Sequence, residues 1–446
     1  MDLGTGMRRA AFEAKTRVGA RSSRSADDAF RQIEALTADE VVRIQRDRSI
    51  RQARFAYRSS PFYRDLYSSH GVTEQDLLDP DAFSALPVVT KADLRAGFGR
   101  VTSSEAGPRN SAVSVTGGST GEPLRVLRDL RFPARALEWR LLRWWGVAPW
   151  ADRGVVTRHI LQGADAERHR RQWWPTRHLQ LDAFSIDEPA LRRFLDEWRS
   201  SRPRLLIGYV GGVLELARFV RASGAEFPSP DAIGLTASAL TPGARADIES
   251  ALGGVAYDPY RSAEVPWIAG ESAARDGLLV FDDVRRVELL GDDGIEVPAG
   301  EEGEVVVSDL TNRVFPVIRY RLGDVTRRVP GLDSSGLPFT RIATIGGRRS
   351  DALRLASGTV IAGALGHLFD DAPSTVRQFD IQQAADYSVV LRCVPADDPG
   401  FPDALETAAR RLRAATRGEV PVEVRVVEEI PHVGGKMRFI RSDAPG

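Results

Sequence analysis

The stretch RLLIGYVGGVLELARFVRAS, from Arg204 to Ser223, joins two different hydrophobic patterns. Its first part, RLLIGY, is a short apolar run of the kind that forms a buried strand. Its second part, GGVLELARFVRAS, spaces its apolar residues so that they fall on one face of a helix. We therefore expect a strand that leads directly into a helix.

Similar segments alternate on both sides of this stretch, from about Arg153 to Asp258. The preceding segment EPALRRFLDEWRSS is helical in pattern, and the following segments AIGLT, PGARADIESAL and GVAYD indicate strand, helix and strand. Strands that alternate with helices in this way are typical of a mainly parallel sheet covered by helices. The sequence predicts an α/β fold with mainly parallel αβ layers.

The pattern changes twice towards the C-terminus. From Gly277 to about Arg328, the segments GLLVF, RRVELL, GEVVVSDL and FPVIRY indicate short strands and a β-rich subdomain. Beyond about residue 352, the order helix, strand, strand, helix, strand predicts a small α+β domain of about a hundred residues, a common domain size. We therefore predict a large N-terminal domain over residues 1–347 and a C-terminal domain over residues 348–446.

Composition excludes several classes of partner. The chain has 446 residues and a formal net charge of zero, so nothing favours nucleic acid or an acidic membrane surface. Its most apolar stretch, Leu205 to Val220, is shorter than a membrane span and contains Glu215. The single cysteine, Cys393, lies in a strand-like segment and is expected in the core, which fits a reducing, cytoplasmic location.

A loop of unusual composition, SVTGGSTGEP, runs from Ser114 to Pro123. Its three glycines and four hydroxyl side chains suit a phosphate, although a plain turn has a similar composition. It is not a Walker A loop, because Glu122 and Pro123 follow the last glycine where Lys and Ser or Thr are required. Neither does it match the dinucleotide-binding GxGxxG pattern.

Lysine is rare in this chain, which makes each one informative. Only Lys15, Lys91 and Lys436 occur among the 61 basic residues, so arginine is used almost wherever a positive charge suffices. Lysine offers a compact charge on a flexible stem, which arginine does not. Lys91 follows Thr90 at the start of a predicted helix, whereas Lys436 lies in the Gly-flanked loop GGKMR.

Five motifs in fixed order carry a family resemblance: TGGSTGEP, YDPYRSAE, FPVIRYRLGD, IGGRRSD and PHVGGKMR. Together they resemble the adenylate-forming superfamily, and in particular the short branch of phenylacetate–coenzyme A ligases and their capsular-polysaccharide-biosynthesis relatives. The resemblance implies ATP-dependent activation of a carboxylic acid, aromatic in the named relatives, as an acyl-adenylate. Pyrophosphate is released, and the acyl group is transferred to coenzyme A. It also implies that the C-terminal domain is a mobile lid.

The resemblance assigns roles to individual residues. Lys436 would bridge the carboxylate and the α-phosphate, Glu264 would bind Mg²⁺, and Asp324 would accept both ribose hydroxyls. Tyr260 would stack on adenine, with Asp258 and Ser238 at the border of the base. Arg348 would order the linker, Asp351 would be the hinge, and Tyr209 and Trp267 would line the acid pocket. The phosphate loop would comprise Thr116, Gly117, Gly118, Ser119, Thr120 and Gly121.

Several positions depart from the family pattern. Glu122 stands where relatives often have Lys, so it must point away from triphosphate or engage another cation. Arg261 replaces a glycine, Ala263 a hydroxyl residue, and Ser238 a common glutamate. The altered stretch Tyr260–Glu264 leaves open transfer to an amine or other nitrogen nucleophile. Glu122, Ser238 and Ala263 leave open a nucleotide-binding protein without turnover.

Two further expectations concern metal content and assembly. The segment GESAARDGLL has neither Cys nor His where some relatives carry them, so we expect no zinc. A homodimer is the default expectation for the assembly.

Overall fold

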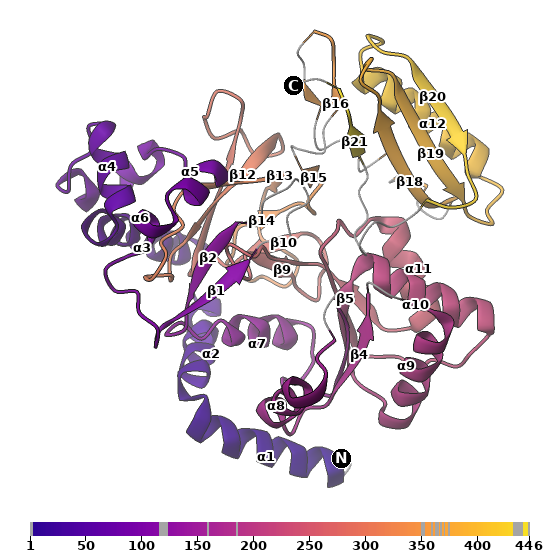
Figure 1. Cartoon of the computed structure of the whole chain (residues 1–446), viewed down its shortest axis with the longest axis horizontal. Helices are drawn as coiled ribbons and strands as arrows, with labels where there is room; N and C mark the ends of the chain where they lie inside the picture. The colour runs from indigo at the N-terminus through magenta and orange to yellow at the C-terminus, as the bar shows by residue number, and fades with distance from the viewer. Residues whose placement is uncertain are drawn as a thin grey trace. The chain divides into compact units, whose positions relative to one another are not determined.

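The computed structural model describes residues 3–115, 124–157, 160–183, 186–348, 353–357, 360–361, 365, 368–369, 371–372, 375–430 and 440–444 (Figure 1). The chain divides into two compact units. The first unit comprises residues 1–14, 145–258 and 344–446, and the second comprises residues 15–144 and 259–343. The helix α1 (Leu3–Gly19) spans the division near the N-terminus.

A five-stranded parallel sheet forms the centre of the first unit, in the order β4-β3-β5-β6-β7. Its strands are β3 (Arg153–Thr157), β4 (His178–Asp182), β5 (Leu205–Tyr209), β6 (Ala232–Thr236) and β7 (Val255–Tyr257). The connecting helices are α8 (Gly163–Trp173), α9 (Glu188–Ser201), α10 (Val210–Ser223) and α11 (Pro242–Leu252). The predicted parallel α/β arrangement is confirmed.

Trp198 on α9 explains part of the packing of this sheet. Its side chain is fully buried, and its indole nitrogen donates to the carbonyl of Pro228 at 2.8 Å. It lies so close to β3 that a Cβ on Gly154 would approach its ring to 2.5 Å. Only glycine therefore allows this helix and strand to approach without rearrangement.

The C-terminal part of the first unit has a second sheet, in the order β20-β19-β18-β21. Its elements are β18 (Val376–Gln383), β19 (Val389–Pro395), α12 (Phe401–Ala415), β20 (Val422–Val426) and β21 (Ile440–Ser442). The short strands β15 (Gly347–Arg348), β16 (Leu353–Arg354) and β17 (Val360–Ile361) precede them. Cys393 is a buried core residue as expected, and burial raises the pKa of its thiol to about 12.

The second unit combines N-terminal helices with antiparallel strands. Its helices are α2 (Arg21–Glu34), α3 (Ala38–Ser59), α4 (Pro61–Ser69), η1 (Asp76–Leu78), η2 (Pro80–Ala85), α5 (Lys91–Ala96), α6 (Phe98–Val101) and α7 (Arg135–Trp144). The strands run in the order β11-β12-β13-β14-β10-β9-β8, and β1 pairs with β2 as a separate hairpin. The predicted β-rich subdomain is confirmed.

The strands of the second unit are mostly short. They are β1 (Ser111–Val115), β2 (Arg125–Asp129), β8 (Pro259–Tyr260), β9 (Ala269–Glu271), β10 (Leu278–Val280), β11 (Arg285–Leu290), β12 (Glu302–Asp309), β13 (Tyr320–Val329) and β14 (Arg341–Ile342). The segment FPVIRY, predicted as a strand, joins one only at Tyr320. Its apolar residues are buried in an irregular segment, so burial rather than strand pairing accounts for their hydrophobicity.

One local prediction and one helix boundary in the second unit have a clear physical basis. The helix after Thr90 is confirmed, because Thr90 and Asp93 form a reciprocal capping box. The segment SSPFYRDLYSSHGV interrupts the preceding helix only at Ser60, and α4 begins at once with Pro61. Proline is accommodated at the first helical position, where its missing N–H has no helical partner to lose.

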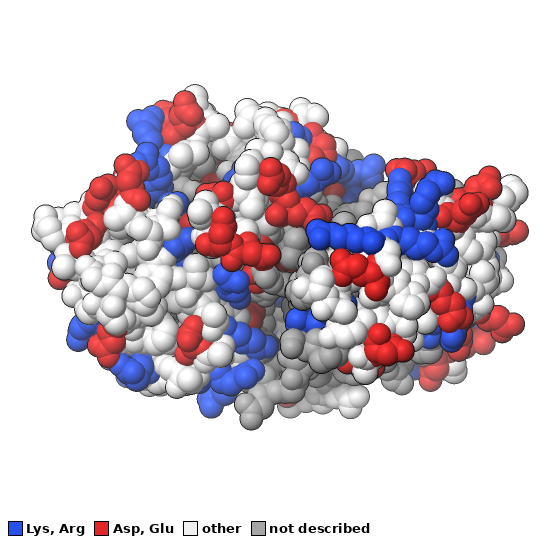
Figure 2. Space-filling model, turned by 90° about the horizontal axis from the view of Figure 1, so that it is seen from above, with Lys and Arg blue, Asp and Glu red and all other residues white. Residues whose placement is uncertain are grey.

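Two observations concern the distribution of surface charge and the hydropathy of the helices. Basic and acidic side chains are interspersed over the face shown in Figure 2. None of the helices in the described part of the chain combines the length and hydropathy that crossing a membrane requires.

Candidate active site

The residues with sequence-predicted roles fall into three groups. Tyr260, Glu264, Trp267 and Asp324 lie in the second unit. Tyr209, Ser238, Asp258 and Arg348 lie in the first unit, with Arg348 placed by its backbone in β15. The phosphate loop Thr116–Gly121, the hinge Asp351 and Lys436 lie outside the described residues.

Tyr260 and Asp324 are brought together in the second unit. The Tyr260 hydroxyl donates a hydrogen bond of 2.7 Å to Oδ2 of Asp324, and both side chains are 7% exposed. Tyr260 lies on β8, while Asp324 lies within β13 rather than in a turn. A buried hydroxyl that donates to one oxygen of a carboxylate fixes the orientation of that carboxylate. The second oxygen is then held in a defined position, as recognition of the two hydroxyls of a diol requires.

The segment between Tyr260 and Trp267 forms a closed loop. The Val265 amide donates to Oγ of Ser262 at 2.9 Å, and the Ile268 amide donates to the Tyr260 carbonyl at 2.9 Å. Trp267 has a φ of +57°, a left-handed conformation that is uncommon for a residue with a large side chain. The geometry of this loop is therefore held by one hydrogen bond that joins its ends and by another inside it.

The buried side chain of Arg285 contacts the C-terminal end of this loop. The Arg285 guanidinium donates to the carbonyls of Pro266 and Trp267 at 2.8 Å and 3.2 Å. It also pairs with Asp309 at 2.7 Å, and neither side chain of the pair is more than 3% exposed. These contacts stabilise the left-handed Trp267 backbone, which would otherwise cost about 1–3 kcal/mol.

Glu264 has the environment of a carboxylate that could hold Mg²⁺. It is partly exposed, and its Oε1 accepts a hydrogen bond of 3.2 Å from the buried hydroxyl of Tyr320. One carboxylate that also leaves room for water and phosphate oxygens fits the preference of Mg²⁺ for oxygen ligands. The residues present are compatible with the predicted metal.

The hairpin β1–β2 places the ends of the predicted phosphate loop. Val115 at the end of β1 is paired with Arg125 at the start of β2, so residues 116–124 connect adjacent points. The Ser114 hydroxyl donates to the carbonyl of Ala263 at 3.4 Å. The strand that leads into the loop therefore contacts the segment that carries Glu264.

In the first unit, three predicted residues share one edge of the parallel sheet. Tyr209 ends β5, Ser238 follows β6 by two residues, and Asp258 follows β7 directly. Carboxyl ends of parallel strands meet at a common edge, where ligands bind in open α/β sheets. Tyr257, beside Asp258, stacks on Trp145 with ring centroids 4.9 Å apart and planes 8° apart.

Sequence reasoning missed two residues of this site. Tyr320, which donates to Glu264, lies inside the motif FPVIRYRLGD but received no role of its own. Ser114, which contacts Ala263, was assigned only to the glycine-rich loop region. In both cases the only available signal was membership of a motif, because the partner is far away along the chain.

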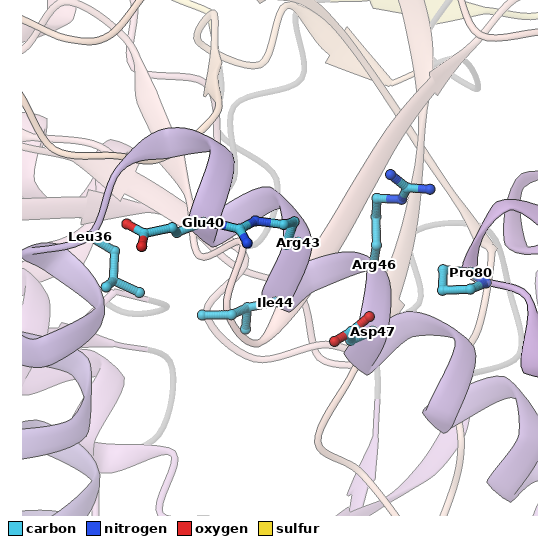
Figure 3. Close-up of a pocket in the computed structure, with 7 residues that line it drawn as sticks. All are labelled: Leu36, Glu40, Arg43, Ile44, Arg46, Asp47 and Pro80. Carbon is cyan, nitrogen blue, oxygen red and sulfur yellow. The ribbon is translucent and has the colours of Figure 1, made fainter.

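A surface hollow lies apart in sequence from all of these residues (Figure 3). Charged side chains of α3 and the first residue of η2 line it, and none of them belongs to the five motifs. Its lining comprises Leu36, Glu40, Arg43, Ile44, Arg46, Asp47 and Pro80. The residue types and the motif chemistry favour the Tyr260–Glu264 region, so we assign the hollow no role.

Comparison with known proteins finds relatives of similar sequence over most of the chain. The chain is 25% identical over 414 residues to a phenylacetate-coenzyme A ligase of Aromatoleum evansii, covering 88% of this chain and 91% of that protein. It is 28% identical over 350 residues to the phenylacetate-coenzyme A ligase of Escherichia coli, covering 75% and 77% of the two chains. No protein-family model matches the chain.

A solved structure confirms the fold independently. The chain aligns with a crystal structure of 2-hydroxyisobutyryl-CoA ligase in the postadenylation state with a TM-score of 0.74. The alignment covers 92% of this chain and 91% of the other at 18% sequence identity. Together with the sequence relatives, it supports one class of protein: the chain is similar to coenzyme A ligases in sequence and to an adenylate-forming ligase in fold. The sequence relatives named here are phenylacetate-coenzyme A ligases, and the chain is similar to them over three quarters or more of its length.

Proposed function

We propose that this enzyme activates a carboxylic acid with ATP and transfers the acyl group to coenzyme A. In the first step a carboxylate oxygen attacks the α-phosphorus of ATP, and the bond to pyrophosphate breaks. In the second step the thiolate sulfur attacks the acyl carbon, and AMP leaves. The observation that carries the proposal is the buried hydrogen bond between Tyr260 and Asp324, which joins two nucleotide-binding motifs of the superfamily.

The described residues suit the binding of the nucleotide. Asp324 would accept the ribose hydroxyls through the carboxylate that Tyr260 orients, and the Tyr260 ring would pack against adenine. Asp258 and Ser238, at the carboxyl edge of the parallel sheet, would border the base. Glu264 would hold Mg²⁺, which neutralises phosphate charge when bound. Thr116–Gly121 would bind the β- and γ-phosphates through backbone N–H groups.

The remaining roles concern closure and the acid. Residues 348–446 would form a lid that turns at Asp351, with Arg348 ordering the linker and Lys436 entering the site for adenylation. Tyr209 and Trp267 would line the acid pocket. The acid is proposed to be aromatic because the sequence relatives are named for phenylacetate. A reducing, cytoplasmic location and a homodimeric assembly complete the proposal.

An amine or other nitrogen nucleophile is the alternative acceptor. The altered segment Arg261–Ala263 motivates it, since it lies between Tyr260 and Glu264. A nucleotide-binding protein without turnover is the second alternative, motivated by Glu122, Ser238 and Ala263. The retained Glu264, Asp324 and Lys436 argue against it, because binding alone does not require a mobile lysine.

Acid-dependent exchange between ATP and pyrophosphate tests the first step. We expect one class among aryl, aryl-acetic, amino-aryl and fatty acids to support exchange, since adenylation is reversible while pyrophosphate is present. Mixing the active acid with coenzyme A and with amines then identifies the acceptor by mass spectrometry. Absence of exchange with every acid, despite measurable ATP binding, would favour the non-catalytic alternative.

Asp324→Asn tests the ribose assignment. A carboxylate that accepts charge-assisted hydrogen bonds is worth about 1.5–3 kcal/mol, so the KM for ATP should rise roughly tenfold to hundredfold. The KM for the acid should change much less. Asp293→Asn, in an exposed turn, is the matched control and should leave both constants unchanged. An unchanged KM for ATP in Asp324→Asn would contradict the assignment.

A further inference from the structure

Two arginines of the second unit have no counter-ion among the residues that the structure describes. Arg128 on β2 and Arg261 in the loop after β8 are both exposed to solvent. Within the described part of the chain, neither guanidinium forms an ion pair or a hydrogen bond with a protein group. The most deeply buried arginines of this unit differ from them, because Arg140, Arg285 and Arg319 each pair with a carboxylate.

The hairpin register places Arg128 on the face of the hairpin that contacts the loop of Arg261. Ser114 is opposite Val126, and Ala112 is opposite Arg128, so these four residues share one face of the hairpin. That face is directed at the loop after β8, since the Ser114 hydroxyl donates to the Ala263 carbonyl. Partial desolvation and the charge of Arg261 lower the pKa of Arg128, as two neighbouring cations require.

Arg261 is held in place by an aromatic ring. Its guanidinium lies 4.7 Å from the centroid of the Trp267 ring, and Arg285 fixes the Trp267 backbone from the other side. A cation over an aromatic face keeps its N–H donors available at the edges of the guanidinium plane. Two cations that influence each other and have no anion paired with them in the described part of the chain create a positive potential that favours an anionic ligand.

We propose that Arg128 and Arg261 bind a second carboxylate on the acid substrate, so that the preferred substrate is a dicarboxylic acid. This inference rests on the proposed function and specifies its substrate class. The paired N–H donors of an arginine guanidinium match the planar geometry of a carboxylate. Trp267 offers an apolar surface to the carbon skeleton of the substrate.

The position of Arg128 favours the acid over the phosphates of ATP. Arg128 lies three residues beyond Arg125, the first residue of β2, which is about 10 Å along an extended strand. The Arg128 backbone is therefore separated from the end of the hairpin to which the segment assigned to the β- and γ-phosphates is attached. Arg261 also stacks on Trp267, which the sequence assigned to the acid pocket.

Matched pairs of acids provide the kinetic test. Benzoate is compared with terephthalate, phenylacetate with 4-carboxyphenylacetate, and hexanoate with adipate, all by ATP–pyrophosphate exchange. The wild-type protein should use one diacid with a kcat/KM at least tenfold above that of its monoacid. Arg261→Gly and Arg128→Gln should each lower kcat/KM for that diacid roughly tenfold to hundredfold, as expected for a lost charge-assisted contact.

The same variants distinguish a role of the arginines in binding the acid from a role in binding ATP. The KM for ATP should stay unchanged in Arg261→Gly and Arg128→Gln, and the control Arg125→Gln should retain the preference for the diacid. Arg125 is a suitable control because it lies on the same strand but on the opposite face of the hairpin. A rise in the KM for ATP instead of the acid would assign the arginines to phosphate and overturn the inference.

Two further outcomes distinguish failure of the inference from failure of the proposed function. A wild-type preference for monoacids would refute the second carboxylate site while leaving adenylation established. If no acid supports exchange, the proposed function fails, and diacid binding is measured directly as a shift in Tm with AMP present. A shift with diacid but not monoacid that disappears in Arg261→Gly would preserve the site; no such shift would refute it.

Discussion

Lys436→Ala is expected to lower the rate of acyl-adenylate formation by roughly a hundredfold to a thousandfold, the effect of losing one preorganised charge at a reacting centre. Negative charge builds on the oxygens between the carboxylate and the α-phosphorus during adenylation. A compact ammonium group on a flexible stem can bridge these oxygens. The Gly-flanked sequence GGKMR suits a side chain that enters and leaves the site. Lys436 lies outside the described residues, so this prediction rests on the sequence and the superfamily assignment.

Three measurements make this result specific. Pyrophosphate exchange should collapse in Lys436→Ala, while the Kd for ATP stays within a few-fold of the wild-type value. Lys91→Ala is the matched control, because Lys91 occupies the first turn of α5 and should leave exchange unchanged. Thioester formation from a supplied acyl-adenylate should persist, since the lysine is proposed to act in the first step. Exchange at the wild-type rate in Lys436→Ala would refute the mechanism.

Arg140→Met is expected to reduce the free energy of unfolding by about 3–5 kcal/mol, the usual effect of leaving one partner of a buried ion pair unpaired. Arg140 on α7 is fully buried, and its two terminal nitrogens donate to the two carboxylate oxygens of Asp283 at 2.8 Å and 2.9 Å. Its guanidinium also lies 4.0 Å from the centroid of the Phe30 ring. The substitution leaves the Asp283 carboxylate buried without its main partner.

Denaturant unfolding of two further variants identifies the cause. Arg140→Met combined with Asp283→Leu should be less destabilised than Arg140→Met alone, because no unpaired charge then remains buried. Arg425→Met removes an exposed pair with Glu423, in which both side chains are 56% exposed, and should change stability little. Equal losses in Arg140→Met and the double variant would show that lost packing, rather than an unpaired carboxylate, dominates.

Local patterns in the sequence were sufficient for most secondary structure in the first unit. The alternation from β5 through α10, β6 and α11 to β7 was predictable because each segment carries its own hydrophobic period. The strand expected in FPVIRY was wrong for most of its length. A short apolar run has the same composition whether it is buried in a strand or in an irregular segment, and only packing distinguishes the two.

The candidate site was likewise only partly predictable from the sequence. The motifs identified Tyr260, Glu264 and Asp324 as residues of interest without showing how they interact. Tyr260 and Asp324 are 64 positions apart, and Glu264 and Tyr320 are 56 positions apart. Such contacts depend on which strands become neighbours, and no local pattern encodes that. The assignments of Lys436, Asp351 and the phosphate loop stay predictions.

The sequence by itself indicated the class of protein that the chain resembles, the alternation of strands and helices, and the set of chemically important residue types. These follow from periodicity and from motifs whose residues lie close together along the chain. Only the tertiary structure decided that the Tyr260 hydroxyl orients Asp324 and that Arg261 stacks on Trp267 beside Arg128. The physical reason is that hydrogen bonds and charge interactions act over a few ångströms in space, whatever the separation along the chain.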